Sequence, residues 1–165
     1  MVAEKETVER ALSGFVERLR DGFGNRLVSV ALYGSWARGD ARPGSDVDIL
    51  IVCDNSSRDR SLRDKEFNPY FDLIDRDLKA GRENGDYPVV SPIVKTPEEA
   101  SYHSPLYLDM VEDARLLFDR EGFLARVLGE VRENLKRLGS RRVPFQGGWY
   151  WDLKPDYRHG DIIEI

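Results

Sequence analysis

Residues 27–53 have the sequence LVSVALYGSWARGDARPGSDVDILIVC, in which two apolar runs enclose a polar segment. Each run is short and rich in Val, Leu and Ile, which is typical of a buried strand. The polar segment begins at Gly34 and is rich in Gly and Pro, so it breaks the regular structure. This stretch predicts a strand over 27–33 and a second strand over 46–52, joined by a turn that contains the start of a short helix.

Two acidic residues, Asp46 and Asp48, stand at the beginning of the second strand. Side chains at i and i+2 of a strand point to the same face, with their Cβ atoms roughly 6–7 Å apart. Like charges beside an apolar strand repel one another and lose hydration, and a divalent cation relieves that cost. Carboxylate oxygens suit Mg²⁺ together with substrate phosphates. We therefore expect a magnesium site here; the alternative is two solvated acids at an exposed strand start.

Gly34 and Ser35 directly follow the first strand, where the backbone turns into a helix. Free backbone N–H groups and the helix dipole favour an anion at such a turn. Gly34 permits close approach of a phosphate, Ser35 adds a hydroxyl donor, and Arg38 lies one turn further along. An ion pair within the turn, with Asp40, is an equally open reading of Arg38. The expected anion site and cation site together match a nucleoside triphosphate with its magnesium.

The rest of the chain alternates helical and strand-like patterns, which favours an α/β or α+β fold with a mixed sheet. Apolar residues recur at helical spacing over 4–20 and over 124–138, so both segments are expected to be helices. The other expected elements are a helix that begins at Asn68-Pro69 and ends at Gly81, a capping box at Thr96, and strands over 87–94 and 114–118.

The chain length of 165 residues predicts one domain over 1–165, with a core over about 4–119 and a C-terminal helix and tail over about 120–165. We expect the helices to lie mainly on one side of the sheet. Pro92 places its strand at an edge or an end, because proline cannot donate a hydrogen bond within a sheet. The tail is rich in aromatic residues and is expected to pack on the domain.

The formal net charge of −5 argues against a protein that grips nucleic acid across a whole face. No apolar run approaches the roughly 20 residues of a membrane span, and the N-terminus has no apolar signal segment. The single cysteine, Cys53, excludes an intrachain disulfide, and two histidines do not suggest a zinc site. These features predict a reduced, cytoplasmic protein without a membrane segment.

The decisive pattern is Gly34-Ser35, ten residues, and then Asp46-Val47-Asp48 with apolar residues on both sides. It resembles the signature of the DNA polymerase beta-like nucleotidyltransferase superfamily. The form GSWARG and the short chain are most similar to the minimal nucleotidyltransferases of archaea and bacteria. The resemblance covers about 27–53 directly, and the order of strands and helices extends it to about residue 100.

The resemblance implies a polymerase beta-like fold and Mg²⁺-dependent transfer of a nucleoside monophosphate, first of all AMP from ATP, to a hydroxyl acceptor with release of pyrophosphate. Asp46 and Asp48 would bind one or two Mg²⁺ ions, and Gly34 and Ser35 would bind the β- and γ-phosphates. The acceptor would be a protein side chain, as in antitoxins that modify a HEPN-type toxin, or a small molecule, as in aminoglycoside nucleotidyltransferases.

One feature departs from the superfamily, whose active members usually carry a third acid on the next strand. In YPVVSPIV the corresponding place is held by Ser91 or Val89, and Asp86, Glu98 and Glu99 only flank the strand. This favours an alternative function, a non-catalytic nucleotide-binding antitoxin or regulatory module that acts by protein contact. A nucleic-acid adaptor is a weaker alternative because of the negative net charge.

Overall fold

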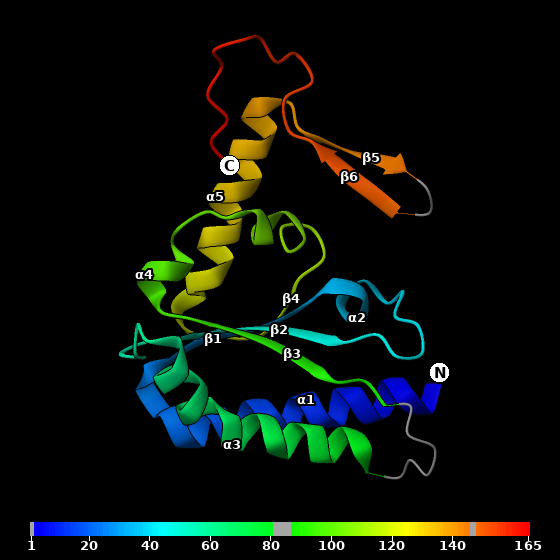
Figure 1. Cartoon of the computed structure of the whole chain (residues 1–165), viewed down its shortest axis with the longest axis vertical. Helices are drawn as coiled ribbons and strands as arrows, with labels where there is room; N and C mark the ends of the chain where they lie inside the picture. The colour runs from blue at the N-terminus through cyan, green and yellow to red at the C-terminus, as the bar shows by residue number, and fades with distance from the viewer. Residues whose placement is uncertain (1, 81–86, 146–147) are drawn as a thin grey trace.

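The structure is a computed structural model that describes residues 2–80, 87–145 and 148–165. At its centre is a four-stranded sheet with the order β3-β2-β1-β4 (Figure 1). β1 is antiparallel to β2 and to β4, whereas β2 and β3 are parallel, so the expected mixed sheet is confirmed. The strands are β1 (Leu27–Tyr33), β2 (Val47–Cys53), β3 (Val90–Lys95) and β4 (Arg115–Asp119).

Helices cover both faces of this sheet, as Figure 1 shows. The expectation that they lie mainly on one side is wrong, because β1 is buried along its whole length and β2 along nearly all of it, so each face needs its own apolar cover. One face carries α1 (Val2–Phe23) and α3 (Arg60–Lys79), and the other carries α4 (Pro97–Ala100), the 3₁₀ turn η2 (Pro105–Leu108) and α5 (Phe123–Leu138). The remaining helical elements are η1 (Gly24–Arg26), α2 (Gly34–Arg38) and η3 (Arg120–Gly122).

The alternation along β1 and β2 decides which layer each polar side chain faces. Tyr33 and Asp48 are paired across the two antiparallel strands, so their side chains share one face of the sheet. Tyr33 packs in the core with Tyr107 and Met110, next to α5. Asp48 therefore faces the layer of α5 and η2, and not the layer of α1 and α3.

The helix α3 begins earlier than the expected start at Asn68-Pro69. Asp59 caps it by accepting a hydrogen bond of 2.8 Å from a backbone N–H of the first turn. Pro69 lies inside the helix, where it removes one backbone donor. Burial of the aromatic ring of Phe67 in the preceding turn offsets that loss, so tertiary packing overrides the local signal. Gly81, where this helix was expected to end, lies outside the described residues.

The C-terminal region contains a second sheet that the sequence pattern did not suggest. α5 ends at Gly139 as expected, and β5 (Arg141–Phe145) and β6 (Gly148–Asp152) then form an antiparallel pair. In Figure 1 this pair lies beside the C-terminal end of α5, on the same side of the molecule as α2. Trp151 packs on the core next to α5, whereas Phe145 and Tyr150 are exposed, so the tail packs only in part. Within the described residues, none of the helices has the length and apolar character that crossing a bilayer requires.

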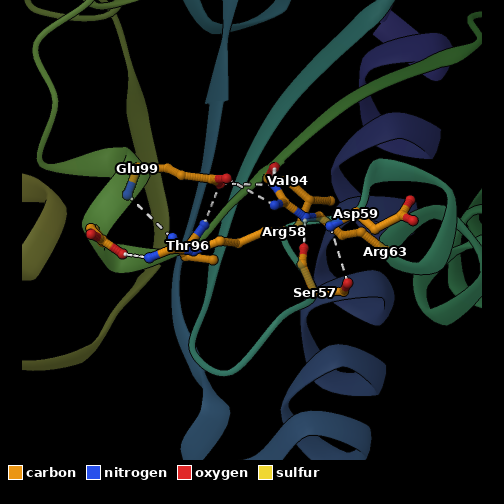
Figure 2. Close-up of polar contacts among 8 residues, drawn as sticks. Ser57, Arg58, Asp59, Arg63, Val94, Thr96 and Glu99 are labelled. Carbon is orange, nitrogen blue, oxygen red and sulfur yellow. Dashed lines mark hydrogen bonds and ion pairs between the residues drawn. The ribbon is translucent and has the colours of Figure 1, made fainter.

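A buried arginine, Arg63, ties α3 to the end of β3 and to α4 (Figure 2). Its guanidinium donates to both carboxylate oxygens of Glu99, at 2.8 and 2.9 Å, and to the carbonyl oxygen of Val94, at 2.6 Å. A further hydrogen bond of 2.8 Å goes to the carbonyl oxygen of Ser57. Glu99 also closes the expected capping box with Thr96, so it fixes the edge strand and the start of α4 together.

We expect Arg63→Met to lower the free energy of unfolding by about 2–3 kcal/mol, because it removes the positive charge that pairs with the Glu99 carboxylate and leaves two carbonyl groups without their arginine donor. Urea denaturation measures the loss. The matched control is Arg58→Met, which breaks an ion pair with Glu98 whose side chains are 82% and 76% exposed. That change should cost less than about 0.5 kcal/mol, and equal losses for the two variants would contradict the structural role of Arg63.

Candidate active site

The candidate site lies where β1 ends and β2 begins, with α2 between them. The helix α2 starts directly after Tyr33 and is closed by a hydrogen bond of 2.9 Å from the Gly39 N–H to the Ser35 carbonyl oxygen. The indole N–H of Trp36 donates to the carbonyl oxygen of Ser45 at 3.1 Å. Trp36 therefore holds α2 against the segment that leads into β2, a packing role rather than a free ring on the surface.

Gly34 touches the carboxylate of Asp48. The backbone of Gly34 has φ = +69°, in the left-handed region, and a Cβ added there would lie 2.2 Å from Oδ2 of Asp48. Both observations require glycine at this position, the first for conformation and the second for space. The glycine turn and the carboxylate of the second strand, which are well separated in the sequence, thus meet in space.

The surroundings of Asp48 disfavour the ionised form of its carboxyl group. Its pKa is raised above the ordinary value, first by burial and then by the negative charge of Asp46. A hydrogen bond from Ser91 and the positive charge of Arg38 act in the opposite direction. Asp46 itself is exposed in the segment just before β2. The two acids repel one another, as their spacing in the sequence predicts.

The third strand brings a hydroxyl and not a carboxylate to this site. Ser91 is paired with Asp48 in the parallel register and hydrogen-bonds to it, so Ser91 holds the inner position. Glu98 and Glu99 are each ion-paired with an arginine beyond the far end of β3, and Asp86 lies outside the described residues. Over 2–80, 87–145 and 148–165, no group of three His, Cys, Asp or Glu side chains is close enough to hold a metal ion.

Arg38 and Ser35 complete the residues that the sequence singled out. Arg38 pairs with Asp40, with 3.2 Å between Nε and Oδ2, and its charge also lowers the pKa of Asp48. Arg38 therefore pairs with Asp40 and at the same time lies close enough to Asp48 to influence its pKa. The hydroxyl of Ser35 makes no hydrogen bond to any residue that the structure describes, which leaves it available to a ligand.

The structure adds a carboxylate that sequence reasoning missed, Asp109, in the segment directly after η2. Burial raises the pKa of Tyr33 to about 12, and the negative charges of Asp48 and Asp109 contribute to the rise. The charge of Asp109 also raises the pKa of Asp48. Asp109 is far from the motif in the sequence and has no fixed spacing to it, so no pattern pointed to it.

Comparison with known proteins identifies the family of this chain. The model of the nucleotidyltransferase domain matches residues 12–116, more than half of the chain. The chain belongs to this nucleotidyltransferase family. It is thus a nucleotidyltransferase enzyme, and the resemblance drawn from the Gly-Ser and Asp-x-Asp motif is confirmed. The family match spans β1, β2 and β3 and ends within β4.

The individual relatives of this nucleotidyltransferase have low sequence identity to it or align with only part of it. A protein of Methanocaldococcus jannaschii, provisionally named a protein adenylyltransferase, is 28% identical over 148 residues, which cover 88% of this chain and 95% of that protein. The protein adenylyltransferase MntA of Thermococcus cleftensis is 44% identical over 46 residues, which cover 28% of this chain and 44% of that protein. The structure of a tri-AMPylated HEPN toxin of Shewanella oneidensis in complex with MNT antitoxin contains a chain that is 15% identical, with a TM-score of 0.48, over 80% of this chain and 92% of that one.

The contact between Gly34 and Asp48 makes a stability prediction. Gly34→Ala places an alanine in the left-handed backbone region, which is strained, and also forces the Asp48 carboxylate to move. It should therefore lower the free energy of unfolding by about 2–4 kcal/mol. Gly39→Ala is the matched control, because Gly39 has φ = +81° and nothing within 4 Å of an added Cβ. The control should cost about 1 kcal/mol in urea denaturation. Equal costs would show that the Asp48 carboxylate does not lie against Gly34.

The raised pKa of Asp48 predicts a pH-dependent gain in stability for Asp48→Asn. The pKa of Asp48 in the folded chain lies above its ordinary value of 3.8, so ionising Asp48 costs more in the folded chain than in the unfolded chain. This penalty is complete above the raised pKa and disappears below 3.8. The variant should therefore melt at a higher temperature than the wild type at pH 7, and the difference should vanish near pH 3. A variant that is less stable at pH 7 would contradict this assignment.

Proposed function

We propose that this nucleotidyltransferase transfers AMP from ATP to a hydroxyl group in a site formed by Gly34, Ser35, Arg38, Asp46 and Asp48. The single observation that carries the proposal is the contact between the left-handed Gly34 and the carboxylate of Asp48. It brings the turn between β1 and α2 next to a pair of acids that repel one another. Such a pair is stabilised when a cation and a polyphosphate bind together.

Asp46 and Asp48 fit Mg²⁺, which binds one or two carboxylates and takes its other ligands from water and substrate phosphates. Bound there, Mg²⁺ would neutralise the two acids and stabilise the negative charge that develops on the triphosphate. Ser91 orients Asp48 through its hydrogen bond, and the backbone of Gly34 packs against the carboxylate from one side. The site therefore needs little rearrangement to receive a metal–nucleotide complex.

The β- and γ-phosphates are assigned to Gly34 and Ser35. The Asp48 carboxylate fills the space beside Gly34 where a side chain would stand. The phosphates are therefore assigned to the backbone N–H groups of the turn and to the unused hydroxyl of Ser35, which donates to a phosphate oxygen. Arg38 reaches the same region and contributes a positive charge. With the triphosphate fixed, the acceptor oxygen attacks the α-phosphorus and pyrophosphate leaves. Positioning supplies a large share of the acceleration in such a transfer.

A protein side chain is the proposed acceptor. The relative of Methanocaldococcus jannaschii, which aligns over 88% of this chain, bears the name of a protein adenylyltransferase, and this supports a protein substrate. The specific candidate is a HEPN-type toxin, with an aminoglycoside-like small molecule as the alternative acceptor. A second candidate function is a nucleotide-binding module without turnover, which the serine at position 91 favours.

The test supplies α-labelled ATP and Mg²⁺ to the full chain in ¹⁸O-labelled water, with and without the protein encoded by the neighbouring reading frame. Transfer predicts pyrophosphate release, label on the added protein, and slow formation of AMP that carries ¹⁸O when water is the only acceptor. Calorimetric binding of ATP without any of these products would establish the module instead. Absence of Mg²⁺-dependent ATP binding would overturn both functions.

The double variant Asp46→Asn/Asp48→Asn checks the residues. Its transfer rate should fall by about 10³-fold or more, because the metal and the charge it stabilises are lost. The matched control is Asp21→Asn/Asp72→Asn, which removes two exposed acids from α1 and α3 on the other face of the sheet. The control should retain wild-type turnover. Equal losses in the two double variants would refute the assignment of Asp46 and Asp48.

A further inference from the structure

The proposed site leaves the proton of the acceptor hydroxyl without a base. Asp46 and Asp48 are committed to the metal, and Ser91 occupies the place beside Asp48 on the third strand. We propose that Asp109, from the segment after η2, is the catalytic base that binds the acceptor hydroxyl and takes its proton. This inference rests on the proposed function and assigns a further catalytic residue to the same site.

Asp48 lies on the same side of the sheet as the segment that carries Asp109. Tyr33 and Asp48 form a pair on the face of the sheet that η2 and α5 cover. Tyr33 packs in one core with Tyr107 and Met110, which stand two residues before and one residue after Asp109. Because these two neighbours are buried and Asp109 is exposed, its backbone is held at the rim while its carboxylate faces solvent.

The charge pattern agrees with that placement. The carboxylate of Asp109 raises the pKa of both Tyr33 and Asp48, so it lies within electrostatic reach of the end of β1 and the start of β2. Within the part of the chain that the structure describes, Asp109 has no hydrogen bond or ion pair through its side chain. A carboxylate next to the site and without a structural partner is available to a substrate hydroxyl.

Both flanks of Asp109 are fixed by the C-terminal region. The indole N–H of Trp151 in β6 donates to the carbonyl oxygen of Leu108 at 3.0 Å. Arg132 of α5 donates to the carbonyl oxygen of Val111. Arg142 of β5 pairs with Asp113 further along, at 2.8 Å. The pair of strands β5 and β6 thereby gains a role, since it positions the segment that carries the base.

Asp109 acts as a base and not as a third metal ligand. Its carboxylate does not form a metal-binding group of three with Asp46 and Asp48, because no such group occurs over the described ranges. In the transfer, the acceptor O–H proton moves to Asp109 and a bond forms from the acceptor oxygen to the α-phosphorus. The bond from the α-phosphorus to the bridging oxygen breaks, and pyrophosphate leaves with the electron pair.

The experiment measures AMP formation with water as acceptor for the wild type, Asp109→Ala, Asp109→Glu and the control Asp72→Ala. We expect Asp109→Ala to lose about 10²-fold in kcat with little change in ATP affinity, as general-base catalysis implies. Added sodium formate should restore part of the rate in Asp109→Ala and none in the wild type. Asp109→Glu should keep intermediate activity, and Asp72→Ala should behave as the wild type.

Binding of Mn²⁺ and ATP, followed by calorimetry, separates the roles of the acids. Asp109→Ala should bind both as the wild type does, because the residue contacts only the acceptor. Full activity of Asp109→Ala, a parallel loss of ATP binding, or a loss that formate does not relieve would overturn the inference while the proposed function stands. A wild type that forms neither AMP nor a labelled acceptor protein would refute the proposed function itself.

A second variant, Trp151→Phe, tests the positioning. It keeps an aromatic ring at the core but removes the N–H that donates to the carbonyl oxygen of Leu108. We expect a smaller loss of kcat than in Asp109→Ala, no formate rescue and an unchanged affinity for ATP. Wild-type kcat in this variant would show that the hydrogen bond from β6 does not position the base.

Discussion

The arrangement of the whole site depends on one contact, the carboxylate of Asp48 packed against the backbone of Gly34. A half-buried carboxylate with a second acid two residues away is unfavourable by itself, and the shifted pKa of Asp48 expresses that cost. The fold tolerates this unfavourable energy because apolar burial on both faces of the sheet stabilises β1 and β2. Local instability at the site is thus compensated by the core, which is the usual relation between a reactive centre and its scaffold.

Each layer of the fold contributes to keeping this contact in place. The pairing of β1 with β2 sets Tyr33 and Asp48 side by side, and the parallel register of β3 brings Ser91 to the same carboxylate. The end of β3 is in turn fixed by Arg63 and its bidentate ion pair with Glu99. On the other face, α5 and the C-terminal strands hold the segment that contains Asp109. Elements that lie far apart in the sequence therefore together position the carboxylates of Asp48 and Asp109 and the hydroxyl of Ser91.

The sequence predicts the local part of this arrangement well. The two strands around Gly34 and the glycine end of α5 follow from apolar spacing and from backbone preferences that act within a few residues. The early start of α3, the cover on both faces and the C-terminal strand pair were missed, because long-range packing decides them. The same holds for Asp109, whose approach to Asp48 depends on how η2 packs against Tyr33. The motif locates the acid pair, and only the fold brings a further acid near it.

The most direct test of the central claim is a crystal structure of the full chain with Mg²⁺ and a non-hydrolysable ATP analogue. The contact between Gly34 and Asp48 predicts a metal ion bound by the Asp46 and Asp48 carboxylates, with the triphosphate lying over Gly34 and Ser35. A triphosphate bound elsewhere, for example in the groove of about 800 Å³ that Arg58, Arg63 and Lys95 line between α3 and β3, would contradict it.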